Sequence, residues 1–326
     1  MKQINKLPIA FTIAILLFVG CSKDDSSSST TSTTQQNTNL TAREQAVKDY
    51  NEMYLTTNVT DVELAWSGNS ASCNPGTISQ VALDRSLVRL NYFRKICGLP
   101  YNMVWNQAWL VGCQQAALMM YANNALSHTP PSTWKCFTQE GADVAGISNI
   151  ALGTPSYHSS RTISGWIEDT GAGNKAVGHR RWMLFSRAKE YGLGSTVGSS
   201  VLHCIEHTGD PLPSNAPAYI AYPPAYIPQS LAYARWSLGI SNPNSFFSGV
   251  DLSAVTVKMT DAQGADVPVT IISSTDDGYG DQTVVWEPTG INTTSTADVK
   301  YHIVVDNFKL NGVAKKYEYD VTVIKP

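Results

Sequence analysis

The sequence predicts an α+β protein in which helical segments come first and strands follow. Between Ser79 and Cys97, apolar residues recur every three or four positions, which is the spacing of one face of a helix. Beyond Trp236, short runs rich in β-branched residues alternate with Gly, Asp and Asn turns, a pattern typical of strands. A proline-rich stretch, residues 209–235, separates the two patterns and predicts a linker lying on the surface.

Residues 1–20 predict a lipoprotein signal peptide. Lys2 and Lys6 precede an apolar run from Leu7 to Val19, which is shorter than the about 20 residues that a membrane-spanning helix needs. The residues Phe18-Val19-Gly20-Cys21 resemble a bacterial lipobox, and this similarity implies cleavage before Cys21 and attachment of acyl chains such as palmitate. The alternative is an ordinary cleaved signal peptide that happens to end near a cysteine.

Residues 21–40 predict a flexible tether, because this Ser/Thr/Gln/Asn-rich tract has too little apolar surface to offset the entropy of ordering. Lys23-Asp24-Asp25 resembles the export signal of surface lipoproteins in the Bacteroidetes group. We therefore expect the protein on the outer face of a bacterial outer membrane, with the lipid bilayer as its partner through Cys21. The alternative for the charged residues is a solvated linker.

The composition argues against a nucleic-acid partner. Charged residues make up 15% of the 326 residues, below the usual share of about 25%, and the formal net charge is −3. No basic stripe or nucleic-acid motif is present in the sequence. The hydrophobic content of 43% is ample for buried cores.

The first domain, residues 41–208, is predicted to begin with a helix from Thr41 to about Leu55, since Thr41 and Glu44 have the spacing of a capping box. The further helices and strands are predicted at Ser79–Cys97, ended by Gly98, at Asn106–Asn124, around 163–167, and, as strands, within 191–206.

The second domain, residues 236–326, is predicted to be an all-β, immunoglobulin-like sandwich. Its expected strands are separated by turn residues at a spacing that suits such a sandwich, and they lie at 255–260, 267–273, 282–287, 301–306 and 317–324.

Cysteine usage fits a compartment that permits disulfides. Apart from Cys21, five cysteines remain, so at least one thiol is unpaired. Cys97 and Cys113 fall in helical patterns and are expected in the core. Cys73 and Cys136 fall in loops, and we expect these two to form a disulfide, although spacing alone does not fix the pairing.

Several segments together resemble the CAP superfamily, which includes cysteine-rich secretory proteins, antigen 5 and plant pathogenesis-related proteins. The resemblance covers about residues 78–206, and the matching segments are Leu90-Asn91-Tyr92-Phe93-Arg94, Gly98-Leu99-Pro100, Trp105-Asn106, Gln114-Gln115-Ala116-Ala117, Leu126-Ser127-His128, Gly165-Trp166 and Gly178-His179-Arg180. It implies an α/β/α sandwich for this domain. Gly178-His179-Arg180 is similar to the bacterial branch, and the C-terminal β domain looks like an extension found in some bacterial members.

The resemblance also implies a central cleft, which in the family is lined by two histidines and two glutamates and in some members holds a divalent ion. His128 and His179 match the histidines, and Asp169 matches one glutamate, with Glu168 beside it as a substitute. Ser148 stands where the family has the other glutamate, and serine is a poor metal ligand. Two imidazoles and one carboxylate suffice for a zinc ion with water in the fourth position. Glu140, on a nearby loop, is a further candidate to replace the missing carboxylate, although nothing in the sequence places it in the cleft.

Two functions follow as hypotheses, beside a third in which the domain is a purely structural interaction module and neither histidine contributes to binding. The first is a surface-anchored binding protein whose cleft holds a lipid, a peptide or a glycan, with or without a divalent metal, and without catalysis. The second is a metal-dependent hydrolase in which an ion on His128 and His179 activates water, with Asp169 or Glu168 as the base. The missing carboxylate at Ser148 argues for the first.

Two other motifs resemble catalytic patterns but do not predict catalytic sites. His203-Cys204-Ile205-Glu206-His207 spells the H-x-x-E-H pattern of some zinc peptidases, but the alternation before it predicts a strand where that chemistry requires a helix. Serines next to histidines, as at 127–128 and 158–160, lack the Gly-x-Ser-x-Gly nucleophile elbow of serine hydrolases.

Overall fold

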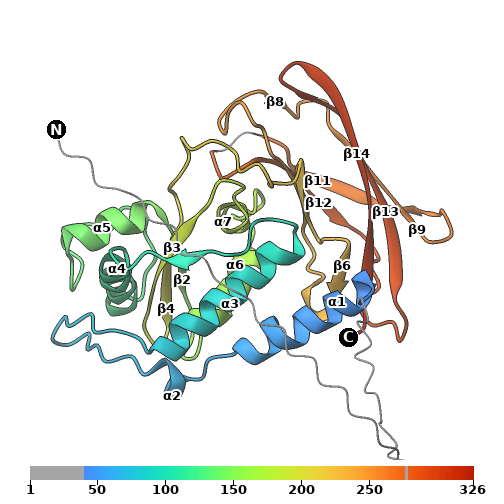
Figure 1. Ribbon diagram of the computed structural model, residues 1–326. Coiled ribbons are helices and arrows are strands. Elements are labelled where there is room, and N and C mark those ends of the chain that lie inside the picture. Colours follow the sequence, from blue (N-terminus) through green and yellow to red (C-terminus); the bar gives the residue numbers. More distant parts are fainter. Residues whose placement is uncertain (1–39, 276–277) are drawn as a thin grey trace, which may run out of the picture. The chain divides into compact units, whose positions relative to one another are not determined.

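A small mixed sheet lies between helical layers in the first part of the chain (Figure 1). Its strand order is β1-β3-β4-β2; β1 runs parallel to β3, and the other neighbours are antiparallel. Helices α4 and α5 cover one face, and α3 and α6 lie on the opposite side (Figure 1). The bounds are α3 Gln80–Ile96, β1 Val104–Trp105, α4 Leu110–Asn123, α5 Gln139–Gly146, β2 Ser148–Leu152, α6 Ser159–Glu168, α7 Gly178–Met183, β3 Glu190–Ser195 and β4 Ser199–His203.

This structure, a computed structural model, describes residues 40–275 and 278–326. The predicted signal peptide, Cys21 and the tether up to residue 39 lie outside the described residues. Within the described part, Leu40–Pro326 form one unit. None of the helices described there is both long and apolar enough to cross a membrane.

The helices begin and end where side chains satisfy the free backbone groups. The capping box at Thr41 and Glu44 starts α1, Ala42–Asp49, which continues as a π-turn and a 3-10 turn to Thr57. Ser79 caps α3 by accepting the N–H of Ala82 at 3.0 Å. These helices agree with the predicted ones.

Helix α4 begins four residues later than predicted. The carboxamide of Asn106 accepts the N–H of Ala108 at 3.0 Å and so builds a turn instead of capping the helix. Three short helices were not predicted: α2, Asp61–Leu64, α5 in the Gly/Ala-rich stretch, and α7. They are too short to show a helical period in the sequence.

Two facing sheets form the second part of the chain (Figure 1). One has the order β10-β9-β13-β14-β6, with β8 paired to β13, and the other has the order β11-β12-β7-β5. Between the sheets, the ring of Trp236 meets Tyr301 edge-on at 6.0 Å, and Trp286 Nε1 lies 3.3 Å from Met259 Sδ. The bounds are β5 Tyr219–Tyr222, β6 Tyr226–Pro228, β7 Trp236–Ile240, β8 Val250–Asp251, β9 Thr256–Asp261, β10 Asp266–Val267, β11 Val269–Ser273, β12 Gln282–Pro288, β13 Val299–Leu310 and β14 Val313–Ile324.

The predicted α+β class, with a helical first part and an all-β second part, is confirmed. The expectation of an irregular linker at 209–235 is wrong for 219–228, because β5 and β6 belong to the two sheets. Both strands lie at sheet edges, where proline is tolerated since one side of the strand needs no hydrogen-bond donor. Pro223 and Pro224 therefore separate two strands instead of excluding them.

One hydrophobic core extends through both parts of the chain. Phe246, on the loop after β7, packs against Trp182 and Phe185 with ring centroids 5.8 and 5.0 Å away. The buried guanidinium of Arg180 on α7 donates to the carbonyl of Arg235 at 2.9 Å and to Ser237 Oγ at 3.1 Å. Helix α7 is thus fixed to the β sheets as well as to its own layer.

Candidate functional site

A cavity of about 250 Å³ opens beside α7. Its walls come from the segment after α4, from the end of α5 and the start of β2, from the loop before α7, from α7 itself, from the segment after β4 and from the loop before β12. The lining residues are His128, Gly146, Ser148, Asn149, Gly173, Asn174, Ala176, Gly178, His179, Trp182, Ile205 and Tyr279. We call this cavity the cleft. It brings together His128, His179 and Ser148.

His179 is held in the cleft by Asp169. The Nδ1–H of His179 donates to Asp169 Oδ1 at 2.8 Å, and the backbone N–H groups of His179 and Arg180 donate to Oδ2 at 2.9 and 3.3 Å. The Asp169 carboxylate is only 1% exposed, so these contacts replace its hydration. Because a carboxylate holds the proton on Nδ1, Nε2 is the ring nitrogen left with a free lone pair.

The loop that joins Asp169 to His179 is fixed by one arginine. Arg235 donates from Nη1 to the carbonyls of Asp169 at 2.7 Å and Asn174 at 2.9 Å, and from Nη2 to that of Gly171 at 2.8 Å. The left-handed backbone of Asp169 (φ 54°) ends α6, and that of Val177 (φ 45°) precedes α7. The loop is therefore held in one conformation, which fixes the position of His179 at the start of α7.

His128 carries its proton on the same ring nitrogen as His179, because of a different contact. It lies exposed beyond the end of α4, and its Nδ1 is 2.8 Å from the carbonyl oxygen of Ala145. A carbonyl only accepts, so Nδ1 carries the proton and Nε2 is again left for a ligand. Both imidazoles thus present an acceptor nitrogen when they are neutral.

The two β2 residues in the cleft are already engaged with the backbone. The hydroxyl of Ser148 donates to the carbonyl of Val144 at 2.6 Å. Asn149 Nδ2 donates to the carbonyl of His179 at 3.0 Å, which links β2 to α7. Ser148 therefore occupies the place of the expected glutamate without supplying a carboxylate.

The remaining predicted carboxylates lie elsewhere. Glu168 lines a separate hollow of about 230 Å³ together with Arg235 and Glu287. Glu140, at the start of α5, accepts a hydrogen bond from Gln115 Nε2 at 3.0 Å. Neither residue lines the cleft, so neither is placed to act as the base of the hydrolase hypothesis.

The donor set does not fit a catalytic zinc site. Such a site uses three protein ligands and one water, whereas the cleft offers two imidazole Nε2 atoms and no free carboxylate. Asp169 orients His179, as an outer carboxylate does in many metal sites, but both of its oxygens are occupied. Within residues 40–275 and 278–326, no group of three or more His, Cys, Asp or Glu side chains is arranged to hold a metal ion.

The H-x-x-E-H segment does not form a peptidase site. His203 ends β4, its Nε2 lies 3.1 Å from Glu206 Oε1, and its ring stacks on Trp109 at a centroid distance of 4.1 Å. His207 contacts Asp210 at 2.9 Å instead. The two histidines sit on a strand end and the turn after it, not on one face of a helix.

The structure joins Cys73 and Cys136 by a disulfide, with Cα atoms 4.9 Å apart. Cys97, Cys113 and Cys204 are free and buried. Burial raises the pKa of Cys97 and of Cys113 to about 12, so both remain uncharged thiols at neutral pH. This agrees with a packing role for the two helical cysteines.

The cleft-lining side chains that were not predicted from the sequence include Asn149, Trp182 and Tyr279. Asn149 and Trp182 lie within one to three residues of expected cleft positions, so their neighbourhood was an available signal. Tyr279 comes from the loop before β12, and nothing in its sequence surroundings links it to a histidine about 100 positions earlier.

The family model described as the cysteine-rich secretory protein family, CAP, matches residues 87–205, which contain both histidines and Asp169. A search of curated proteins finds no match to the chain.

Proposed function

We propose that this chain, whose residues 87–205 belong to the cysteine-rich secretory protein (CAP) family, is a binding protein that captures a small ligand in the cleft. The observation that carries the proposal is that His128 and His179 line one cleft and are both held through Nδ1. Each imidazole has its Nδ1–H engaged inside the protein, and each has Nε2 left for a ligand. Side chains fixed in this way lose little entropy on binding, which favours affinity.

The proposal includes a location. The lipobox-like Phe18-Val19-Gly20-Cys21 and the charged residues after it support a protein anchored by acyl chains to the outer membrane and exposed at the cell surface. A cleft held at the end of a tether of about twenty residues would sample ligands outside the cell.

The test uses the purified mature protein and three probe classes: methyl glycosides, palmitate and short neutral peptides. Calorimetry would compare the wild type with the His128→Ala/His179→Ala double variant. We expect one class to bind the wild type and to bind the double variant at least tenfold more weakly, because two hydrogen-bond acceptors worth about 1 kcal/mol each are lost. Unchanged binding by the double variant, or no binding of any probe, would refute the cleft as the binding site.

The hydrolase hypothesis is the second candidate, and one observation favours it. A buried carboxylate and a backbone carbonyl fix the two imidazoles in the way that outer-shell partners orient metal ligands. Against it stands the absence of a lining carboxylate to serve as third ligand or base among the residues around the cleft. We therefore derive no catalytic step from this geometry.

A further inference from the structure

We propose that Tyr279, from the β part of the chain, forms one wall of the cleft, and that the ligand held there is a single neutral sugar ring. This inference rests on the proposed binding function and specifies its ligand. Tyr279 lies on the loop before β12, lines the cleft together with both histidines, and keeps 41% of its surface exposed. An exposed tyrosine ring at the edge of a cavity offers an apolar face and a polar tip to a ligand.

The ring of Tyr279 is held directly beside His179. It lies over Gly178, the residue before His179, so closely that a Cβ added to Gly178 would come within 3.1 Å of two ring carbons. On another side, the guanidinium carbon of Arg181 is 5.7 Å from the ring centroid, within the range of a cation–π contact. Glycine at 178 therefore has a local reason: it allows a residue of the β part to approach the histidine.

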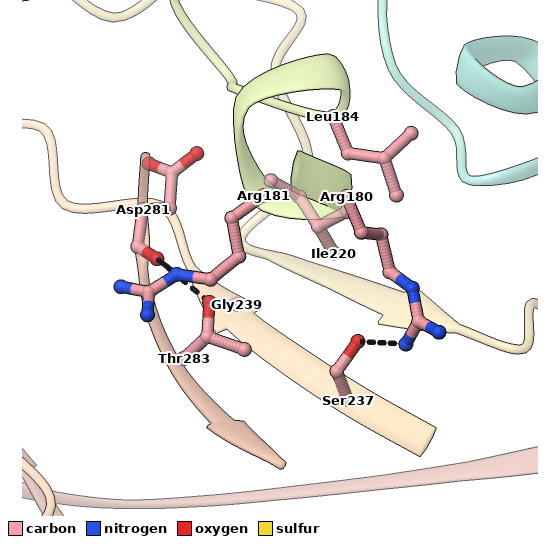
Figure 2. Close-up of a pocket in the computed structure, with 8 residues that line it drawn as sticks. All are labelled: Arg180, Arg181, Leu184, Ile220, Ser237, Gly239, Asp281 and Thr283. Atoms are coloured by element: carbon pink, nitrogen blue, oxygen red, sulfur yellow. Dashed lines mark hydrogen bonds between the residues drawn. The ribbon is translucent and has the colours of Figure 1, made fainter. Parts of the chain in front are cut away.

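The segment after Tyr279 is locked onto α7 as well. Gly280 has a left-handed backbone (φ 44°), and a Cβ there would lie 2.6 Å from the carbonyl oxygen of Arg181. Arg181 Nε donates to the carbonyl of Asp281 at 3.2 Å, and the Asp281 carboxylate accepts from Ser186 N at 2.8 Å and Ser186 Oγ at 2.7 Å. Figure 2 shows Arg181 and Asp281 facing each other across this contact, beside Gly239 and Thr283 of the sheet. Tyr279 is thus positioned by its own contact with Gly178 and by the contacts of the two residues that follow it.

The chemistry of the lining selects the ligand class. No Lys, Arg, Asp or Glu is among the residues that line the cleft, so an ionic ligand would find no permanently charged side chain there to compensate for its lost hydration. The polar groups are two imidazoles, two carboxamides and two hydroxyls. An acyl chain would leave the Nε2 atoms of His128 and His179 without a hydrogen-bond donor. The rings of Tyr279 and Trp182 add apolar surface.

A sugar ring satisfies both kinds of surface. Its C–H faces pack on aromatic rings, and its equatorial hydroxyl groups donate to acceptors such as the Nε2 atoms of His128 and His179. The cavity of about 250 Å³ is slightly smaller than the usual sites for drug-sized ligands, which suits one ring and not a long chain. We therefore expect the cleft to hold one residue of a neutral glycan.

The experiment titrates the purified mature protein with the methyl glycosides of glucose, galactose, mannose and N-acetylglucosamine, using calorimetry and saturation-transfer NMR. We expect one of them to bind, Tyr279→Ala to weaken that binding about tenfold, and Tyr279→Phe, which keeps the ring, to stay within about twofold of the wild type. Tyr101→Ala, at an exposed tyrosine outside the cleft, is the matched control and should bind normally. Thermal unfolding would verify that each variant is folded.

The outcomes separate the two proposals. Sugar binding that depends on the histidines but is unchanged in Tyr279→Ala would overturn the role of Tyr279. Histidine-dependent binding of palmitate or a neutral peptide, with no sugar bound, would overturn the sugar ligand while leaving the binding function standing. If no probe binds, both proposals fail together.

Discussion

At the scale of single residues, Asp169 holds His179 by hydrogen bonds and does not line the cleft. The sequence identifies it as a carboxylate near His179, but only the structure shows that both oxygens are occupied by N–H groups of 179 and 180. A base must have a free lone pair within reach of the proton that it removes. The two histidines and Ser148 could be assigned to the cleft from the sequence, because short motifs carry them; the role of Asp169 depends on loop geometry, which no local motif encodes.

Ser148 allows a direct test of the missing carboxylate. Ser148→Glu places a carboxylate among His128 and His179, so we expect zinc, titrated calorimetrically at pH 7, to bind this variant at least tenfold more tightly than the wild type. Ser148→Gln has nearly the same size without the charge and should leave zinc affinity near the wild-type value. Equal zinc affinity in both variants would mean that position 148 does not face the two Nε2 atoms.

At the scale of elements, a hydrogen-bonded cluster fastens α2 to α6. The buried ring of His158 contacts Asp61 Oδ1 at 2.8 Å through Nε2 and Ser159 Oγ at 2.9 Å through Nδ1, and Ser156 Oγ donates to Asp61 Oδ2 at 3.0 Å. Although it contains Asp, His and Ser, this cluster is unsuited to nucleophilic catalysis, because Ser159 is fully buried. Its role is to hold two short elements together.

This cluster predicts an acid-dependent loss of stability. The hydrogen bond from His158, and then that from Ser156, hold the pKa of Asp61 below its usual range. A carboxylate with a lowered folded pKa stabilises the protein above its unfolded pKa of about 4, and this contribution is lost as the pH falls towards the folded pKa. In thermal unfolding between pH 5 and pH 2.5, Asp61→Asn should therefore flatten the decline of the melting temperature that the wild type shows.

Asp84→Asn provides the control for this pH series, because Asp84 is an exposed carboxylate on α3 that bonds only to Gln80. It removes the same formal charge without touching the cluster. A decline in Asp61→Asn as steep as that of the wild type would show that the Asp61 contacts contribute nothing in this pH range.

Elements with a long period or strong caps were predictable, and short ones were not. The seventeen residues of α3, capped by Ser79 and ended at Gly98, repeat their apolar face several times. Helix α7 has six residues. It is held by Asp169, which lies across the preceding loop, and by the segment around Tyr279, which is distant in sequence. The edge strands β5 and β6 were hidden by prolines that the sheet edges tolerate. Tertiary contacts thus decided these elements.

At the scale of the whole molecule, the cleft depends on both parts of the chain. His128 and His179 come from the CAP segment, whereas Tyr279 comes from the loop before β12. Arg180 connects α7 to strand β7, and Arg181 connects it to Asp281, the residue before β12. The sequence predicts two domains but carries no signal for their contact, because the residues that meet are about 60 to 100 positions apart. Unfolding of the β part should therefore also disturb the cleft.

Phe246 is the residue through which this coupling can be measured. It is 6% exposed and packs on Trp182 and Phe185, so Phe246→Ala should lower the free energy of unfolding by about 3–5 kcal/mol, the usual cost of removing a buried phenylalanine. Its neighbour Phe247 is 60% exposed and contacts Phe246 with ring centroids 4.0 Å apart, so Phe247→Ala should cost only about 1 kcal/mol. Urea unfolding followed by tryptophan fluorescence and by far-ultraviolet circular dichroism would compare the two variants.

We expect coincident unfolding transitions for both probes, since one core extends through the molecule. Separate transitions would mean that the two parts of the chain unfold independently and that the cleft wall formed by Tyr279 is not fixed by the shared core. Equal effects of the two substitutions would mean that the contacts of Phe246 with Trp182 and Phe185 do not stabilise the protein.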